Sequence, residues 1–167
     1  MYERILLAID VTPTEENRSA LTRTEQIGRL TGATVHVLHV ARAHIVPGDI
    51  IGGSGLGVLS AEDDVEAVDR QAVQQLVDSL AAAGIEAHGE MVSATEHDIA
   101  EVILQRAQEL DVDLVVLGHQ HHRGVGNLFQ ASVAERVIRR HPPYSILLAR
   151  PPATSGNRVV EHRARSS

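Results

Sequence analysis

Residues 118–132, with the sequence GHQHHRGVGNLFQAS, combine side chains and backbone that could bind a ligand. The segment holds three histidines, three glycines, an arginine and a serine, and it lies between an apolar run and a helical pattern. Glycine lets a backbone approach a phosphate closely, and arginine can hold a phosphate through two N–H groups. Imidazole, in contrast, is a common metal ligand. The segment is therefore a candidate phosphate cradle or a candidate metal site.

The phosphate interpretation uses four positions of this segment and the residue that follows it, Val133. Gly118 ends the apolar run, Arg123 offers a bidentate contact, and Gly124 keeps the loop pliable. Ser132 and Val133 begin the following helix, where unpaired backbone N–H groups attract an anion. The Ser132 hydroxyl could contact a phosphate or could only cap the helix, and both functions stay open.

The metal interpretation rests on His119 and His121, which point the same way if the segment is extended. Asp10 or His39 could supply a third ligand. The chain has no cysteine and no pair of histidines four residues apart on a helix, so we predict a polar loop with solvated imidazoles and no metal ion.

The ends of two other apolar runs supply further candidates. Asp10 ends the run RILLAID, where it could contact a ligand or could cap a neighbouring backbone group. His39 and Val40 end the run GATVHVLHV and are predicted to form a pocket wall. A histidine on such an apolar strand is more often a satisfied core residue than a ligand, so His39 is interpreted as a core residue.

Composition excludes several classes of function. The 167 residues include one Phe, two Tyr and no Trp, which leaves few rings for stacking nucleobases. The formal charge of −7 argues against general nucleic-acid binding. No apolar run approaches the roughly 20 residues that span a membrane. The first residues, MYERILLAID, predict a strand rather than a signal peptide, so we expect a cytoplasmic protein.

Apolar runs typical of buried strands alternate with segments of helical periodicity. The first helix is expected to begin with Thr12 as its cap, the third with Thr95, and the fourth with a capping box of Ser132 and Glu135. The expected strands cover 4–10, 32–40, 85–92, 112–118 and 144–150, and the expected helices cover 12–28, 61–83, 94–110 and 132–140.

This alternation predicts an α/β fold, a single-domain open parallel five-stranded sheet with helices on both faces. The domain should span residues 1–150, and residues 151–167 are expected to form a disordered tail. Ligands of such sheets bind beyond the carboxyl ends of the strands, where the strand order reverses. The ends at Asp10 and Gly118 should therefore border the pocket.

Three stretches, ILLAIDVTP, DVDLVVLGH and ASVAERVIRRHPPYSILLAR, resemble the universal stress protein family, and the resemblance covers Met1 to about Arg150. It implies the strand order 3-2-1-4-5 of a Rossmann-like fold, similar to the adenine nucleotide alpha hydrolases. It also implies a homodimer formed through the last strand. Many members bind ATP through the pattern G-x-x-G-x9-G-[ST] and through an Asp at the end of the first strand.

On this chain the pattern falls on Gly118, His121, Ala131 and Ser132, and the strand-end carboxylate falls on Asp10. The spacing is kept, but two of the three glycines are replaced. His121 fills space that a phosphate would occupy, and the methyl group of Ala131 disfavours a positive φ.

Two functions follow as expectations. The first is a cytoplasmic stress-response protein that binds an adenine nucleotide, ATP or a relative of it, with or without Mg²⁺, and acts through regulated association. Catalysis is expected to be absent or limited to slow ATP hydrolysis, and no nucleic acid or membrane is an expected partner. The alternative is an A-type member of the family, a dimeric interaction module that binds no nucleotide.

Overall fold

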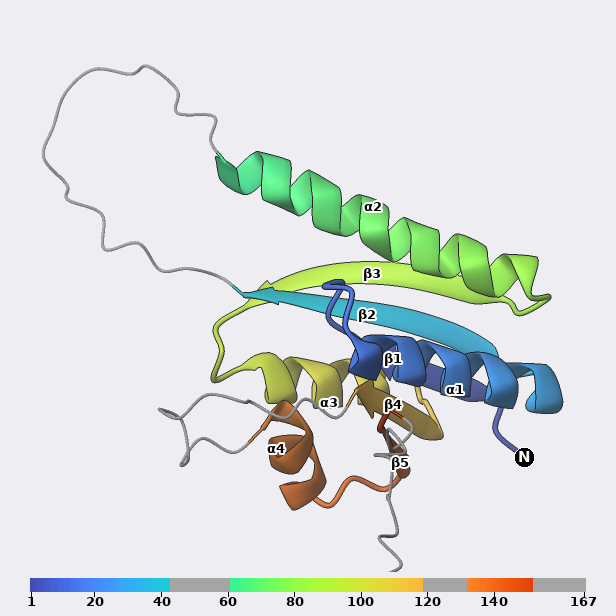
Figure 1. Ribbon diagram of the computed structural model, residues 1–167. Coiled ribbons are helices and arrows are strands. Elements are labelled where there is room, and N and C mark those ends of the chain that lie inside the picture. Colours follow the sequence, from blue (N-terminus) through green and yellow to red (C-terminus); the bar gives the residue numbers. More distant parts are fainter. Residues whose placement is uncertain (43–60, 119–131, 152–167) are drawn as a thin grey trace, which may run out of the picture.

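The computed structural model describes residues 1–42, 61–118 and 132–151. Five strands and four helices alternate along these residues (Figure 1). The strands are β1 (Arg4–Ala8), β2 (Thr34–Arg42), β3 (Ala87–Ala94), β4 (Leu114–Gly118) and β5 (Ser145–Ala149). The helices are α1 (Glu15–Thr31), α2 (Ala61–Ala82), α3 (Ile99–Glu109) and α4 (Val133–Arg139).

The five strands form one sheet in the order β3-β2-β1-β4-β5, and every pair is parallel. The predicted fold class and strand order are therefore confirmed. The order reverses between β1 and β4, the two central strands, whose apolar residues are almost all buried. The expected pocket should lie at the carboxyl ends of these two strands.

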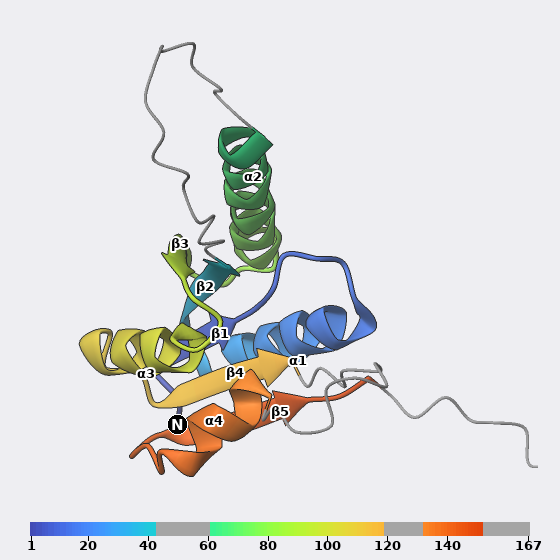
Figure 2. The ribbon, with the colours of Figure 1, turned by 90° about the vertical axis from the view of Figure 1, so that its left-hand side faces the viewer.

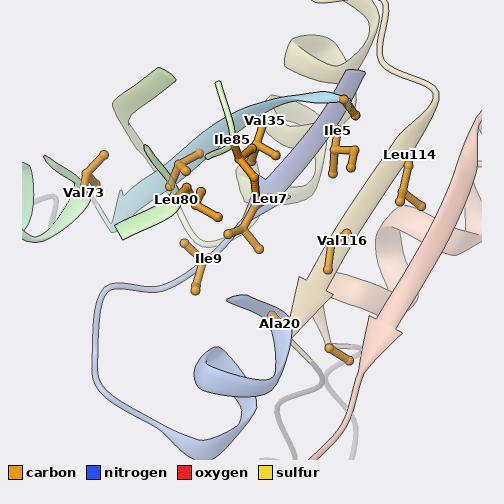
Figure 3. Packing of buried hydrophobic residues seen from close by; sticks show 13 residues of the cluster. Ile5, Leu7, Ile9, Ala20, Val35, Val73, Leu80, Ile85, Leu114 and Val116 are labelled. Atoms are coloured by element: carbon orange, nitrogen blue, oxygen red, sulfur yellow. The ribbon is translucent and has the colours of Figure 1, made fainter. Parts of the chain in front are cut away.

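Helices cover both faces of the sheet, and Figure 2 shows α1 and α3 on opposite sides of β1 and β4. The cluster on the α1 and α2 face includes Leu7, Val35, Val73 and Leu80 (Figure 3). The cluster on the other face joins the sheet to α3 and α4 and includes Ile103. Burying aliphatic side chains on both faces stabilises the layers and holds the strand ends in place.

Two helix starts differ from the expectation. Thr14, not Thr12, caps α1, and its hydroxyl accepts a hydrogen bond from the Asn17 N–H. Thr95 does not cap α3, because its hydroxyl donates to the Asp98 carboxylate and the helix begins only at Ile99. In both cases several polar residues precede the helix and compete for the cap.

The fourth helix begins as predicted. The Ser132 hydroxyl accepts a hydrogen bond from the Glu135 N–H, and the Glu135 carboxylate accepts one from the Ser132 N–H, each at 3.2 Å. The expected tail lies outside the described residues from residue 152 onward. Among the helices of the described ranges, none is both long and apolar enough to cross a bilayer.

Candidate functional site

A cleft of about 1050 Å³ opens beyond the carboxyl ends of β1, β2 and β4. Besides His39, five residues predicted from the sequence line it, and they come from well-separated segments of the chain: Asp10, Val40, Gly118, Ser132 and Val133. The structure thus brings these predicted residues together at the point where the strand order reverses. That they bind a ligand stays a prediction.

The other predicted residues of the segment between β4 and α4 are His121, Arg123, Gly124 and Ala131, and they lie outside the described residues. The histidine pair of the metal interpretation lies there as well. In the part of the chain that the structure describes, no three His, Asp or Glu side chains are arranged to hold a metal ion.

The turn after β1 carries Asp10 on one side of the cleft. One oxygen of its carboxylate, Oδ1, accepts a hydrogen bond from the Thr12 N–H at 2.9 Å. The Asn17 amide donates to the main-chain oxygens of Asp10 and Thr12, both at 2.7 Å. Asp10 therefore does cap a neighbouring backbone group. Its exposed side chain also lines the cleft, and that it contacts a ligand there stays a prediction.

Gly118 ends β4 where the backbone passes close to the first turn of α1. A Cβ atom at this position would lie 3.2 Å from Asn17 Oδ1 and 3.6 Å from the Glu16 carbonyl oxygen. Gly118 is not among the glycines with a positive φ, so it is needed here for space rather than for an unusual backbone conformation.

An extension of β2 and β3 forms a wall of the cleft. Residues 34–38 of β2 pair with β1, whereas His39 to Arg42 pair only with β3. These last residues of β2 therefore project past the end of β1. Val40 is one of them, and it lies half-buried on the wall of the cleft. A position on this wall was predicted from the sequence.

His39 joins this wall to the neighbouring elements. It is buried, and its Nδ1 lies 3.1 Å from the Ile9 carbonyl oxygen. Its Nε2 lies 3.5 Å from an oxygen of Asp69 on α2. The interpretation of His39 as a satisfied core residue is confirmed, although one edge of it also borders the cleft.

The start of α4 faces the cleft from the β4 side. The capping box occupies the N–H groups of Ser132 and Glu135, while Val133 and Ala134, in the first turn, have no acceptor within the helix. Arg136 holds this helix to the turn before α3, because its guanidinium donates to the carbonyl oxygens of Glu96 at 2.9 Å and His97 at 3.4 Å.

Sequence reasoning missed three residues that shape the cleft: Asn17, Asp69 and Arg136. Asn17 carries a usable signal, since it follows Thr14 by three residues and is the donor of that cap. Placing the cap at Thr12 hid this signal. Asp69 and Arg136 carry none, because their positions depend on how α2 and α4 pack against other elements.

The charges along the described walls of the cleft are mostly negative. The lining includes the carboxylates Asp10, Glu66, Asp69 and Glu96, and the guanidinium groups of Arg42 and Arg136. Carboxylates accept hydrogen bonds from hydroxyl and amino groups and repel phosphate. A phosphate bound there would therefore need donors, and the described walls offer the first N–H groups of α4 and the guanidinium groups of Arg42 and Arg136.

A second groove, of about 1170 Å³, lies at the opposite end of the sheet. It contains none of the predicted residues and includes Tyr2, Asp113 and Tyr144. The Tyr144 hydroxyl is buried, and no described residue forms a hydrogen bond with it. Burial raises the pKa of Tyr144, so this hydroxyl is a neutral group rather than an anion.

Comparisons with known proteins agree with this architecture. The model of the universal stress protein family matches residues 1–143. No curated protein matches the sequence. Among solved structures, a universal stress protein from Burkholderia pseudomallei has 22% identity and a TM-score of 0.65, with 90% of this chain and 97% of that chain covered.

Two further structures contain a nucleotide. A universal stress protein in complex with cAMP has 16% identity and a TM-score of 0.63, and the match covers 90% of this chain and 98% of that chain. The protein from Archaeoglobus fulgidus in complex with dAMP has 21% identity and a TM-score of 0.58, and the match covers 89% of this chain and 98% of that chain. These structural similarities show that the fold is shared. The family itself is shown by the family model, because it matches most of the sequence. The chain belongs to the universal stress protein family.

Proposed function

We propose that this protein binds an adenine nucleotide, ATP or a relative of it, in the cleft between Asp10 and Gly118. The observation that carries the proposal is the meeting of Asp10, Val40, Gly118 and Val133 in one cleft at the reversal of strand order. Two family members of the same fold, whose structures contain cAMP and dAMP, support an adenine nucleotide as the ligand.

The charges of the cleft suggest how the nucleotide lies. The hydroxyl and amino groups of the nucleoside face the carboxylates and the wall at Val40. The phosphates face Gly118, Ser132 and the N–H groups that begin α4, where Arg123 and Mg²⁺ would add positive charge. Three more predicted residues, Gly124, His121 and Ala131, lie in the same segment as Arg123, between Gly118 and Ser132.

In this function the nucleotide is bound and undergoes no chemical step. The bound nucleotide regulates the association of the protein with other molecules during a stress response in the cytoplasm. The protein itself acts as a homodimer that pairs through β5, the strand at one edge of the sheet.

Isothermal titration calorimetry with ATP and Mg²⁺ tests nucleotide binding. The wild type should release or absorb heat and gain thermal stability at millimolar ATP. Asp10→Asn removes the charge but keeps the shape and should weaken binding on the order of tenfold, because hydrogen bonds to charged groups are the stronger ones. Asp78→Asn makes the same change on α2 outside the cleft and should have no effect. A wild type without heat or thermal shift would contradict the proposal.

One feature of the sequence favours the A-type alternative, in which the protein binds no nucleotide. His121 and Ala131 stand where the nucleotide pattern of the family has glycine. Changing both residues to glycine separates the two functions. If only the double variant binds ATP, the alternative is correct, and if the wild type binds equally well, the replaced glycines are not needed.

A further inference from the structure

Asn17 is one of three polar residues that are buried among the described residues, together with Thr24 and His39. Within the described part of the chain, Thr24 bonds only inside its own helix, to the Ala20 carbonyl oxygen. Asn17 instead reaches out of α1 to the turn that carries Asp10, although it is only 6% exposed. A buried amide that donates hydrogen bonds outside its own helix holds the segment that it contacts in place.

Both hydrogens of the Asn17 amide are used on that turn. They bond to the carbonyl oxygens of Asp10 and Thr12, each at 2.7 Å. These two oxygens flank the turn, and between them the Thr12 N–H bonds to the Asp10 carboxylate. The direction of that carboxylate therefore depends on main-chain atoms that Asn17 fixes.

The oxygen of the same amide faces the other side of the cleft. Asn17 Oδ1 is the atom nearest to the space that a Cβ of Gly118 would occupy, at 3.2 Å. One side chain thus contacts the turn after β1 and the end of β4, the two strands between which the strand order reverses. A change at Asn17 would move both sides of the cleft.

We infer that Asn17 is the positioning residue of the nucleotide site, and that its amide sets the affinity by holding Asp10 and Gly118 in place before the ligand arrives. This inference rests on the proposed function. A turn that is already ordered does not have to be ordered on binding, which increases affinity. Without the amide, two carbonyl oxygens in a partly buried turn also lose their donors.

Two substitutions test this role against a matched control. Asn17→Asp keeps the shape of the side chain but removes both N–H donors, and Asn17→Ser can replace at most one hydrogen bond. Thr24→Val is the control, because it removes a buried hydrogen bond from the same helix without touching the turn. If Asn17→Asp fails to fold, the comparison of Asn17→Ser with Thr24→Val tests the role of Asn17.

The first measurement is the hydrogen exchange of the Thr12 amide, which needs no nucleotide. It should become about tenfold faster in the Asn17 variants and stay unchanged in Thr24→Val, since only the former loosen the turn. Unchanged exchange in the folded Asn17 variants would overturn the inference.

The second measurement is ATP affinity by calorimetry at a temperature where all variants are folded. The Asn17 variants should bind on the order of tenfold more weakly than Thr24→Val. Equal affinity would overturn the role of Asn17 while leaving nucleotide binding intact. A wild type that binds no ATP would overturn the proposed function and, with it, the claim that Asn17 sets the affinity. The exchange of the Thr12 amide would still show whether Asn17 holds the turn.

Discussion

Gly118 ends β4 at a place where the backbone has little room for a side chain. From sequence alone, a glycine before a ligand loop could serve either an unusual φ or a close approach. The structure gives the close approach as the reason, and the neighbour at 3.2 Å is Asn17 Oδ1. This residue could be selected from sequence, but its neighbour could not, because the contact joins segments about a hundred residues apart.

Gly118→Ala should therefore disturb the site by crowding. The added methyl group would push Asn17 away, which should lower the free energy of unfolding by about 1 kcal/mol and weaken ATP binding. Urea denaturation and calorimetry measure the two effects. Unchanged stability together with unchanged affinity would show that the turn and β4 are not in contact as described.

His36 gives a prediction about pH. It lies beside His88 on the neighbouring strand, with 5.4 Å between the ring centroids. Burial, followed by the charges of His88 and Arg4, lowers the pKa of His36 from 6.5, while Glu86 and Glu90 oppose this shift. The unfolded chain therefore binds a proton at His36 more readily than the folded protein does.

The free energy of unfolding should consequently fall as the pH drops below 6.5, the ordinary value of this histidine. His36→Gln should reduce that loss, because glutamine does not titrate. Urea denaturation at about pH 7.5 and about pH 5.5 measures the difference. His97→Gln, at an exposed position, serves as the control. The same loss in His36→Gln as in the wild type would refute this role.

The packing of α2 on β3 depends on a second glycine. A Cβ at Gly89 would lie 2.8 Å from a methyl carbon of Val73 and 2.8 Å from one of Val77, both on α2. Sequence periodicity predicted this helix and this strand, but not that they pack against each other at Gly89. Such a contact depends on the angle between the elements, which no local pattern encodes.

Gly89→Ala should push α2 away from the sheet and lower the free energy of unfolding by about 2 kcal/mol. Because α2 carries Asp69 at the wall of the cleft, ATP affinity should fall as well. Adding Val77→Ala removes one of the two close contacts and should recover part of the loss. A Gly89→Ala protein as stable as the wild type would contradict this packing.

For the molecule as a whole, sequence patterns predicted an alternating α/β fold, and the family resemblance supplied the strand order. Both are confirmed. The patterns also identified the strand ends that meet in the cleft, because the carboxyl ends of parallel strands share one edge of a sheet. The caps of α1 and α3 were predicted two and three residues too early, since several polar side chains there compete for each cap.

The edge strand β5 gives a prediction about assembly. Among the described residues it pairs with β4 alone, so the N–H and C=O groups on its other side form an edge that needs covering. We expect two copies to join through β5. Light scattering at tens of micromolar should give twice the mass of one chain, and the mass of a single chain would reject the dimer.

The most direct test of nucleotide binding in this cleft is the response of backbone amide NMR signals to added ATP and Mg²⁺. The largest shifts should occur at Asp10, Val40, Gly118 and Val133, which line the cleft. Shifts concentrated instead at Tyr2, Asp113 and Tyr144, in the groove at the opposite end of the sheet, would contradict the account. So would the absence of any shift at millimolar ATP.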